Sequence, residues 1–396
     1  MDRTNSAARS KKDNQLFDAK FFEGGPPLKL QSLFGLSSLG YSNVVLLVGV
    51  AVLAGWLPLA VLSFLQSAEA GTEFLSDFNV HARYLAAMPL LIIAERISAP
   101  RMGALAHNFL AAGLVTQADQ IRFHELRVST RRLLNATWVE VLVLALAYLV
   151  VTLAFYRSSF SMFPSWALVP GRAITLSPAG WWAMFVSLPL LITLLLSWLW
   201  RFCLWARFLL AISKMDLQLV PAHPDGAAGL RFIGYSAQAF AVLALAFGAL
   251  AAGSVVEAVK AGTSFASHHY FIGFFVAGVV VLLNAPLLVF FSQLLKAWRR
   301  GTMEYGALAD DFGREFERKW FNCSQPQDHT VLEQQDFSAA ADLYQVVDRV
   351  YAMWLVPIHL KSVVLLIIAS LLPFVPVALM AVPFDVIVAK LEGLIF

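Results

Sequence analysis

Long apolar runs limit the fold of this chain more than any other feature of its sequence. Most of them contain about the 20 residues that an α-helix needs to cross the hydrocarbon core of a bilayer. Only 14% of the residues are charged and 59% are hydrophobic, whereas soluble domains average about 25% charged and about 45–50% apolar residues. Backbone groups inside a bilayer must be satisfied internally, which favours helices. The sequence therefore predicts an all-α, polytopic transmembrane helix bundle.

We expect about seven membrane spans in this bundle. They cover residues 43–65, 82–94, 136–156, 181–200, 235–256, 271–295 and 363–382. The second run is short, so a re-entrant or interfacial segment is the alternative for it. Prolines lie inside several spans, among them Pro89 and Pro189, but proline is common in such helices and none is specific.

The basic residues predict the orientation of the chain. In the seven-span interpretation, most of the 29 lysines and arginines fall on the side that carries the N-terminus. The opposite side has only Arg83, Arg157, Arg172, Lys260 and Lys390. By the positive-inside rule, the N-terminus is cytoplasmic and the C-terminus is periplasmic, in a bacterial inner membrane. Without the span at 82–94 this alternation would fail, which favours a complete span there.

The same interpretation divides the chain into four parts. They are a polar, basic and largely disordered tail (1–42), spans one to six with cytoplasmic helical loops at 99–134 and 201–231 (43–295), a small cytoplasmic helical hairpin (296–361), and the last span with the C-terminal segment (362–396). Two helices broken near Gly113 are expected between residues 102 and 134.

An apolar stripe on the first hairpin helix needs a partner. Its members recur at steps of four and are Leu308, Phe312, Phe316 and Trp320. We expect the stripe to pack on the cytoplasmic extension of the fourth span, on Leu204, Trp205, Phe208 and Ile212. The fifth span has small residues at helical spacing, among them Ala244 and Gly248, which predicts close approach of a neighbouring helix.

Asn284 is the most polar residue in the middle of a span, and Pro286 follows it closely. A proline kink frees a backbone carbonyl beside the amide, so Asn284 is a candidate for contacting a solute or ion. An interhelical hydrogen bond at a packing kink is the alternative, and we favour it. No ionisable residue occupies the middle of a predicted span, which argues against proton pumps and voltage sensors.

A Pro- and Gly-rich loop before the fifth span holds His223 and Asp225, and Asp216 precedes it. These residues are candidates for binding a cation or for acid–base chemistry. The alternative, which we favour, is a turn in which Asp225 caps the helix leading into the fifth span. One histidine and few carboxylates are too small a set for a metal site. We expect the loop to lie at the cytoplasmic membrane face, packed against the hairpin of Trp298 to Met353, with His223 partly buried.

Other chemical signals are missing from the sequence. It has no glycine-rich phosphate loop and no GxSxG, HExxH or CxxC motif, so no cofactor and no catalytic residue is predicted. Cys203 and Cys323 both fall in expected cytoplasmic segments, so a disulfide is not expected. No basic run interleaved with aromatic residues occurs outside the membrane flanks, and we expect no nucleic-acid partner.

Two stretches carry a resemblance to a known family. Residues 198–234 read WLWRFCLWARFLLAISKMDLQLVPAHPDGAAGLRFIG, and residues 304–320 read EYGALADDFGREFERKW. They resemble a family of bacterial multi-pass inner-membrane proteins without an established activity. The resemblance covers the chain from about the third span onward and implies topology only.

Three functions remain, ranked in this order. The first is a channel or transporter for a small solute, with Asn284 lining the path. The second is a membrane-embedded signalling or scaffold protein whose hairpin binds a cytoplasmic protein. The third is an enzyme at the cytoplasmic membrane face, acting through His223 and Asp225. The expected partners are the lipid bilayer and either a second copy of the chain or a cytoplasmic protein.

Overall fold

The computed structural model describes residues 21–26, 44–157, 163–169, 175–321 and 335–381. Within these ranges all regular secondary structure is helical, apart from two isolated β-bridges. The all-α prediction is thus confirmed for the described part of the chain.

Five helical segments of the described residues are long and apolar enough to cross a membrane. They comprise α3 (Val44–Gly55) with α4 (Leu57–Gln66), α9 (Thr137–Arg157), α10 (Pro178–Trp182) with α11 (Leu188–Ile212), α13 (Ala241–Lys260), and α14 (His269–Asn284) with α15 (Phe291–Trp320). A sixth is reached if α17 (Leu360–Leu371) and α18 (Phe374–Ala381), a pair bent by 44°, form one span. These helices support a membrane-embedded protein, and the expected total of seven spans stays a prediction.

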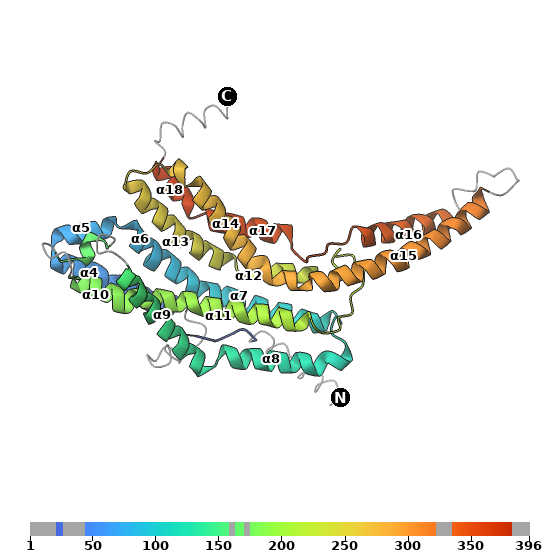
Figure 1. Cartoon of the computed structure of the whole chain (residues 1–396), viewed down its shortest axis with the longest axis horizontal. Coiled ribbons are helices and arrows are strands. Elements are labelled where there is room, and N and C mark those ends of the chain that lie inside the picture. Colours follow the sequence, from blue (N-terminus) through green and yellow to red (C-terminus); the bar gives the residue numbers. More distant parts are fainter. Residues whose placement is uncertain (1–20, 27–43, 158–162, 170–174, 322–334, 382–396) are drawn as a thin grey trace, which may run out of the picture.

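The expected second span at 82–94 lies within a helical rod in the bundle (Figure 1). The rod comprises α6 (Phe78–His81), a π-helical turn (Ala82–Ala87) and α7 (Met88–Ala111). It is not one of the five apolar segments, and α3, α11 and α13 all contact it. A helix enclosed in this way can carry charged residues such as Arg83 and Glu95, because neighbouring helices shield them from lipid. The rod ends just before Gly113, whose φ of +66° breaks the helix where the sequence predicted.

The bundle has two dissimilar ends (Figure 1). At one end, which we call the α5 end, α5 (Ala68–Ser76) lies beside α4 and α10. At the other, the hairpin end, α8 (Gln120–Leu134) packs along α11, and α15 leaves the bundle together with α16 (Gln335–Tyr351). Both α7 and α11 run from the α5 end towards the hairpin end, so their first residues lie at the same level.

The apolar stripe of the hairpin packs on α16 rather than on α11. The Phe337 ring lies 5.1 Å from both Phe316 and Trp320, while Leu308 stays 54% exposed. The prediction of packing on the extension of the fourth span is therefore wrong. The hairpin helices follow one another closely in the chain, and each supplies an apolar face to the other.

The apolar face of α11 is covered instead by α8 and by part of the N-terminal tail. Phe21 and Phe22 are buried there, with ring centroids 5.1 Å from Phe208 and 5.6 Å from Trp205. Arg201 donates a hydrogen bond to the Gly24 carbonyl (2.9 Å). The expectation of a largely disordered tail therefore does not hold for residues 21–26, because an aromatic pair within the polar tail has an apolar groove to fill. The rest of residues 1–42 lies outside the described residues.

Close packing of α13 on α17 confirms the prediction from the small residues of the fifth span. A Cβ on Gly248 would lie 2.4 Å from the Ser370 carbonyl oxygen. Only glycine permits this approach of two helix backbones. On the other side of the rod, an ion pair between Arg201 and Glu95 (2.8 Å) joins α11 to α7.

Candidate functional site

A cavity of about 490 Å³ lies at the α5 end, between the rod, α9, α11 and the segment at 163–167. This volume falls within the roughly 300–1,000 Å³ of small-molecule sites. Most of the wall is apolar and comes from membrane helices, including Val151, Leu188, Leu191 and Leu195. The polar lining residues are fewer and are concentrated on the first turns of the rod.

Two π-helical turns shape this cavity. One covers Ala82–Ala87 before α7, and the other covers Ala183–Ser187 before α11. A proline, Pro89 or Pro189, is the second residue of the helix that follows each turn. Proline lacks the N–H that would continue the regular α-helical ladder, and single π turns are frequent at functional sites. Both turns contribute lining residues.

Arg83 and Tyr84 come from the first π turn and line the cavity. Tyr84 is only 2% exposed, yet its hydroxyl makes no hydrogen bond within the part of the chain that the structure describes. The Arg83 guanidinium likewise makes no ion pair or hydrogen bond with any residue that the structure describes. The Oδ1 atom of Asn79, also in the lining, is buried without a partner. Since buried polar groups in proteins nearly always have partners, the cavity offers the donors of Arg83 and Tyr84 to a ligand.

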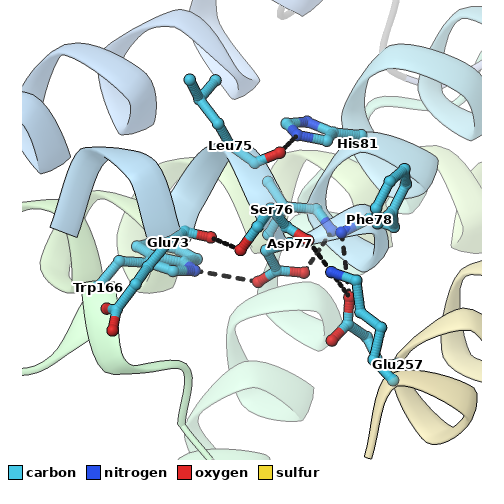
Figure 2. Close-up of polar contacts among 10 residues, drawn as sticks. Glu73, Leu75, Ser76, Asp77, Phe78, His81, Trp166 and Glu257 are labelled. Atoms are coloured by element: carbon cyan, nitrogen blue, oxygen red, sulfur yellow. Dashed lines mark hydrogen bonds and ion pairs between the residues drawn. The ribbon is translucent and has the colours of Figure 1, made fainter. Parts of the chain in front are cut away.

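Asp77 also lines the cavity, but its carboxylate is already engaged (Figure 2). Its Oδ1 accepts from the Val80 N–H (3.1 Å) and caps α6, and its Oδ2 accepts from the Trp166 indole N–H (3.0 Å). Beside it, Glu73 accepts a hydrogen bond of 2.5 Å from the Ser165 hydroxyl. These contacts hold the segment at 163–167 against α5 and α6, where it closes one side of the cavity.

Glu257 and Lys260, which also lie near this end, pair with each other. The backbone N–H of Phe78 donates to Glu257 Oε1 (3.0 Å), as Figure 2 shows. Lys260 lies 3.6 Å from Glu257, donates to the Ser76 carbonyl and sits 4.5 Å above the Phe78 ring. Arg83 is thus the cation that the lining leaves available to an anion, among the residues that the structure describes.

Asn284 occupies a packing position. Its Nδ2 donates to the Val280 carbonyl one turn earlier (2.9 Å), and its Oδ1 is buried without a partner. A 3₁₀ turn containing Pro286 follows at Ala285–Phe290. Asn284 lines neither the cavity at the α5 end nor the cavities near Asp216 and His223. The hydrogen bond lies within α14, so the predicted interhelical bond is absent among the described residues, while the kink beside the buried Asn284 agrees with a packing position.

Asp225 organises its own loop. Its carboxylate accepts from the backbone N–H groups of Ala227 (2.8 Å), Gly229 (3.1 Å) and Arg231 (3.1 Å). Burial alone would raise the pKa of Asp225, but these donors and His223 together lower it below its ordinary value. Asp225 is not the N-cap expected from the sequence, since Leu230 holds that position before the 3₁₀ turn at Arg231–Tyr235. It still satisfies the first N–H of that turn.

His223 lies 2.9 Å from Asp225 through Nδ1, and its side chain is 44% exposed. A neutral Nδ1 accepts from the Asp225 N–H (3.2 Å), whereas a protonated Nδ1 donates to the carboxylate. The loop packs at the base of the hairpin, as expected: the Trp354 N–H donates to the Gly226 carbonyl (2.8 Å), and Arg231 lies over the Trp354 ring.

Asp216 does not join this pair. It is exposed and lines a different cavity from His223 and Asp225. Its backbone N–H donates to Asp119 Oδ2 (3.1 Å). Among the described residues, no three His, Cys, Asp or Glu side chains are grouped so that they could hold a metal ion.

Comparisons with known proteins add no relative: no family model, no curated protein and no solved structure matches the chain. The resemblance to bacterial inner-membrane proteins therefore stays a prediction.

Sequence reasoning missed Arg83 and Tyr84. Arg83 lies near the end of a predicted span, whereas an ionisable residue indicates function most clearly in the middle of one. The motif x-P-L occurs in four predicted spans, with prolines at Pro58, Pro286, Pro89 and Pro189, so it did not single out Pro89 and Pro189. These prolines follow the two π turns that line the cavity.

Proposed function

We propose that this chain is an integral protein of a bacterial inner membrane that binds an amphipathic organic anion in the cavity at the α5 end. The acid group of the ligand lies against Arg83 and Tyr84, and its apolar part lies along α9 and α11. The observation that carries the proposal is a guanidinium that makes no ion pair or hydrogen bond with any described residue, in a cavity whose walls are mainly apolar.

Charge energetics favour this ligand class. A cation that loses water without gaining a partner is destabilised by several kcal/mol. A carboxylate or phosphate supplies charge-assisted hydrogen bonds worth about 1.5–3 kcal/mol each. The apolar walls add about 0.8 kcal/mol for each methylene group removed from water. A purely polar anion would lack the second contribution, and a neutral apolar molecule would leave Arg83 unpaired.

The proposal narrows the transport hypothesis. A small solute carried by this protein would be an amphipathic anion, and binding is the step that the cavity supports. The ligand enters from the lipid phase on the side of α9, where Ala154 of the lining is exposed.

Binding can be tested with dodecanoate and dodecanol, two probes that share a chain and differ in the charge of the head. We expect the purified wild-type protein to bind dodecanoate at least about tenfold more tightly, since one charge-assisted hydrogen bond exceeds the 1.4 kcal/mol that a factor of ten requires. Arg83→Gln should remove the preference and Arg83→Lys should restore part of it. Arg314→Gln, on the exposed hairpin, is the control. Equal dodecanoate affinities of wild-type protein and Arg83→Gln would refute the proposal.

Orientation is a separate part of the proposal. The basic residues place the hairpin end in the cytoplasm and the α5 end outside. Reporter fusions after Arg300 and after Phe396 should then report opposite sides of the membrane. The same side for both would remove either the last span or the proposed orientation.

A further inference from the structure

A second cavity, of about 560 Å³, lies at the hairpin end, where the turn after α11 meets the start of α15. Three basic residues line it: Lys214 from the turn, and Lys296 and Arg300 from α15. Asp216 is the one acidic residue in the lining. The cavity is independent of the one at the α5 end and shares no residue with it.

The cations of this cavity are largely free to meet a ligand. No ion pair or hydrogen bond of either lysine side chain is found within the described ranges. Arg300 donates one hydrogen bond to the Leu219 carbonyl (3.0 Å) and lies 4.0 Å from Glu304, the outer limit of an ion pair. Lysines and arginines converging from two elements attract phosphate groups.

The backbone carbonyl groups beside the cavity do not oppose the binding of an anion. Carbonyl groups at the C-terminal end of a helix carry partial negative charge, which would repel one. Here Gln293 Nε2 donates to the carbonyls of Ser213 (2.7 Å) and Met215 (2.9 Å), just after the end of α11. The carbonyls that would oppose an anion are therefore occupied.

Two acceptors in the same lining lack donors. Gln293 Oε1 is buried without a partner, because Nε2 of the same amide is held by the two carbonyls. The Asp216 carboxylate has no hydrogen bond among the described residues. A simple anion would satisfy the cations, but it would leave the buried Gln293 Oε1 unpaired and the exposed Asp216 carboxylate to water alone, so the lining matches a ligand that carries an anionic group next to a donor.

We propose that this cavity binds a phosphate ester with an adjacent hydroxyl or ammonium group. Lys214, Lys296 and Arg300 hold the phosphate, and Gln293 Oε1 with Asp216 accepts from the donor. Such a group can belong to a lipid head or to a soluble metabolite. The sequence has no Asp, Glu, Lys or Arg between Lys260 and Lys296, so the site begins where a long uncharged stretch ends, as expected for a site that binds a lipid head group.

The test uses three probes on the purified full-length protein: dihexanoyl-phosphatidylglycerol, dihexanoyl-phosphatidylcholine and glycerol 3-phosphate. The first has a hydroxyl donor beside its phosphate, the second has none, and the third has no lipid chains. We expect phosphatidylglycerol to bind more tightly than phosphatidylcholine, and Lys214→Gln/Lys296→Gln to weaken it about tenfold or more. Arg314→Gln/Arg318→Gln on the hairpin removes the same charge and should change nothing.

The probes also show whether the bound phosphate ester belongs to a lipid head group or to a soluble metabolite. If the protein binds phosphatidylglycerol but not glycerol 3-phosphate, the natural ligand is a lipid. If it binds both equally, the natural ligand is a soluble ester. Asp216→Asn should reduce the preference over phosphatidylcholine. Unchanged affinity in the double lysine variant, or equal weakening by the hairpin control, would overturn the proposal. Since all the substituted residues are exposed, thermal unfolding should be unchanged and loss of binding cannot be attributed to loss of the fold.

Discussion

The two ends of the bundle each hold a cavity of similar volume, but the cavities differ in the number of their basic residues and in the exposure of these residues to solvent. At the α5 end one arginine, half-buried beside Tyr84, faces mainly apolar walls. At the hairpin end three cations line an open surface together with polar groups. A charge in a low-dielectric environment is poorly screened, whereas exposed charges are screened by salt. The comparison predicts that the cavity at the α5 end distinguishes ligands by the charge of the head group and by the apolar chain. The cavity at the hairpin end should distinguish ligands by their net charge.

Charge reversal should produce the largest effect. Arg83→Glu places a carboxylate against the acid group of the ligand, so repulsion replaces attraction. We expect dodecanoate affinity to fall about 100-fold, which corresponds to about 2.7 kcal/mol. Binding of dihexanoyl-phosphatidylglycerol at the hairpin end should stay unchanged, and calorimetry on the same preparation measures both. A parallel loss of both ligands would mean that the variant is misfolded or that the two cavities are not independent.

Salt should separate the two ends next. Raising ionic strength from about 0.1 M to about 1 M shortens the Debye length from about 10 Å to about 3 Å. We expect phosphatidylglycerol affinity at the hairpin end to fall about tenfold, while dodecanoate affinity changes less than about twofold. A titration of each ligand at both salt concentrations checks this, and an equal response would show that the charge at the α5 end is as accessible to solvent as the lysines are.

The features of these two ends that could be predicted from the sequence are those that depend on residues close together in the chain. Helix positions, the break at Gly113 and the close packing at Gly248 follow from local composition, and the structure agrees with them. The partner of an apolar stripe does not follow in this way. Any apolar face of sufficient length can cover such a stripe, so the sequence did not show which face would do so. In the structure, Phe316 and Trp320 pack on Phe337 of α16 and not on α11.

The cavity at the α5 end was harder still to predict. It is assembled from segments far apart in the chain, and its shape depends on two π turns. A π turn differs from an α turn by one residue of register, a difference that proline permits but does not dictate. Arg83 near a helix end is also what a membrane anchor would look like in sequence alone. What separates the two interpretations is that Arg83 makes no ion pair or hydrogen bond with the residues that the structure describes.

A smaller effect is expected from Tyr84→Phe. Removing one neutral donor from a bound acid costs about 0.5–1.5 kcal/mol, so dodecanoate affinity should fall about three- to tenfold. Tyr148→Phe is the matched control, because the Tyr148 hydroxyl on α9 already donates to the Phe185 carbonyl (3.0 Å). A variant of Tyr84 that binds dodecanoate like the wild type would remove the hydroxyl from the site while leaving Arg83 in it.

The smallest effect concerns Asp225, the acid at the hairpin end that we assign to structure and not to a ligand. Its native pKa lies below the ordinary value of 3.8, so its ionised form stabilises the loop. That stabilisation is complete above the pKa of the unfolded chain and disappears as pH falls through the lower native pKa. Hydrogen exchange of the peptide that contains Ala227, Gly229 and Arg231 should therefore be slower in wild-type protein than in Asp225→Asn at neutral pH.

This difference should shrink as the pH falls below about 4, where carboxyl groups of ordinary pKa begin to be protonated. Comparing the two proteins at each pH cancels the intrinsic pH dependence of exchange. His223 and Arg231 contact the same carboxylate, so His223→Gln provides the control for the imidazole. Exchange that is equally fast in both proteins at neutral pH would show that the three backbone hydrogen bonds do not hold the loop. Asp225 would then be free for a ligand, as Asp216 is in the neighbouring cavity, and the hairpin end would carry two candidate sites instead of one.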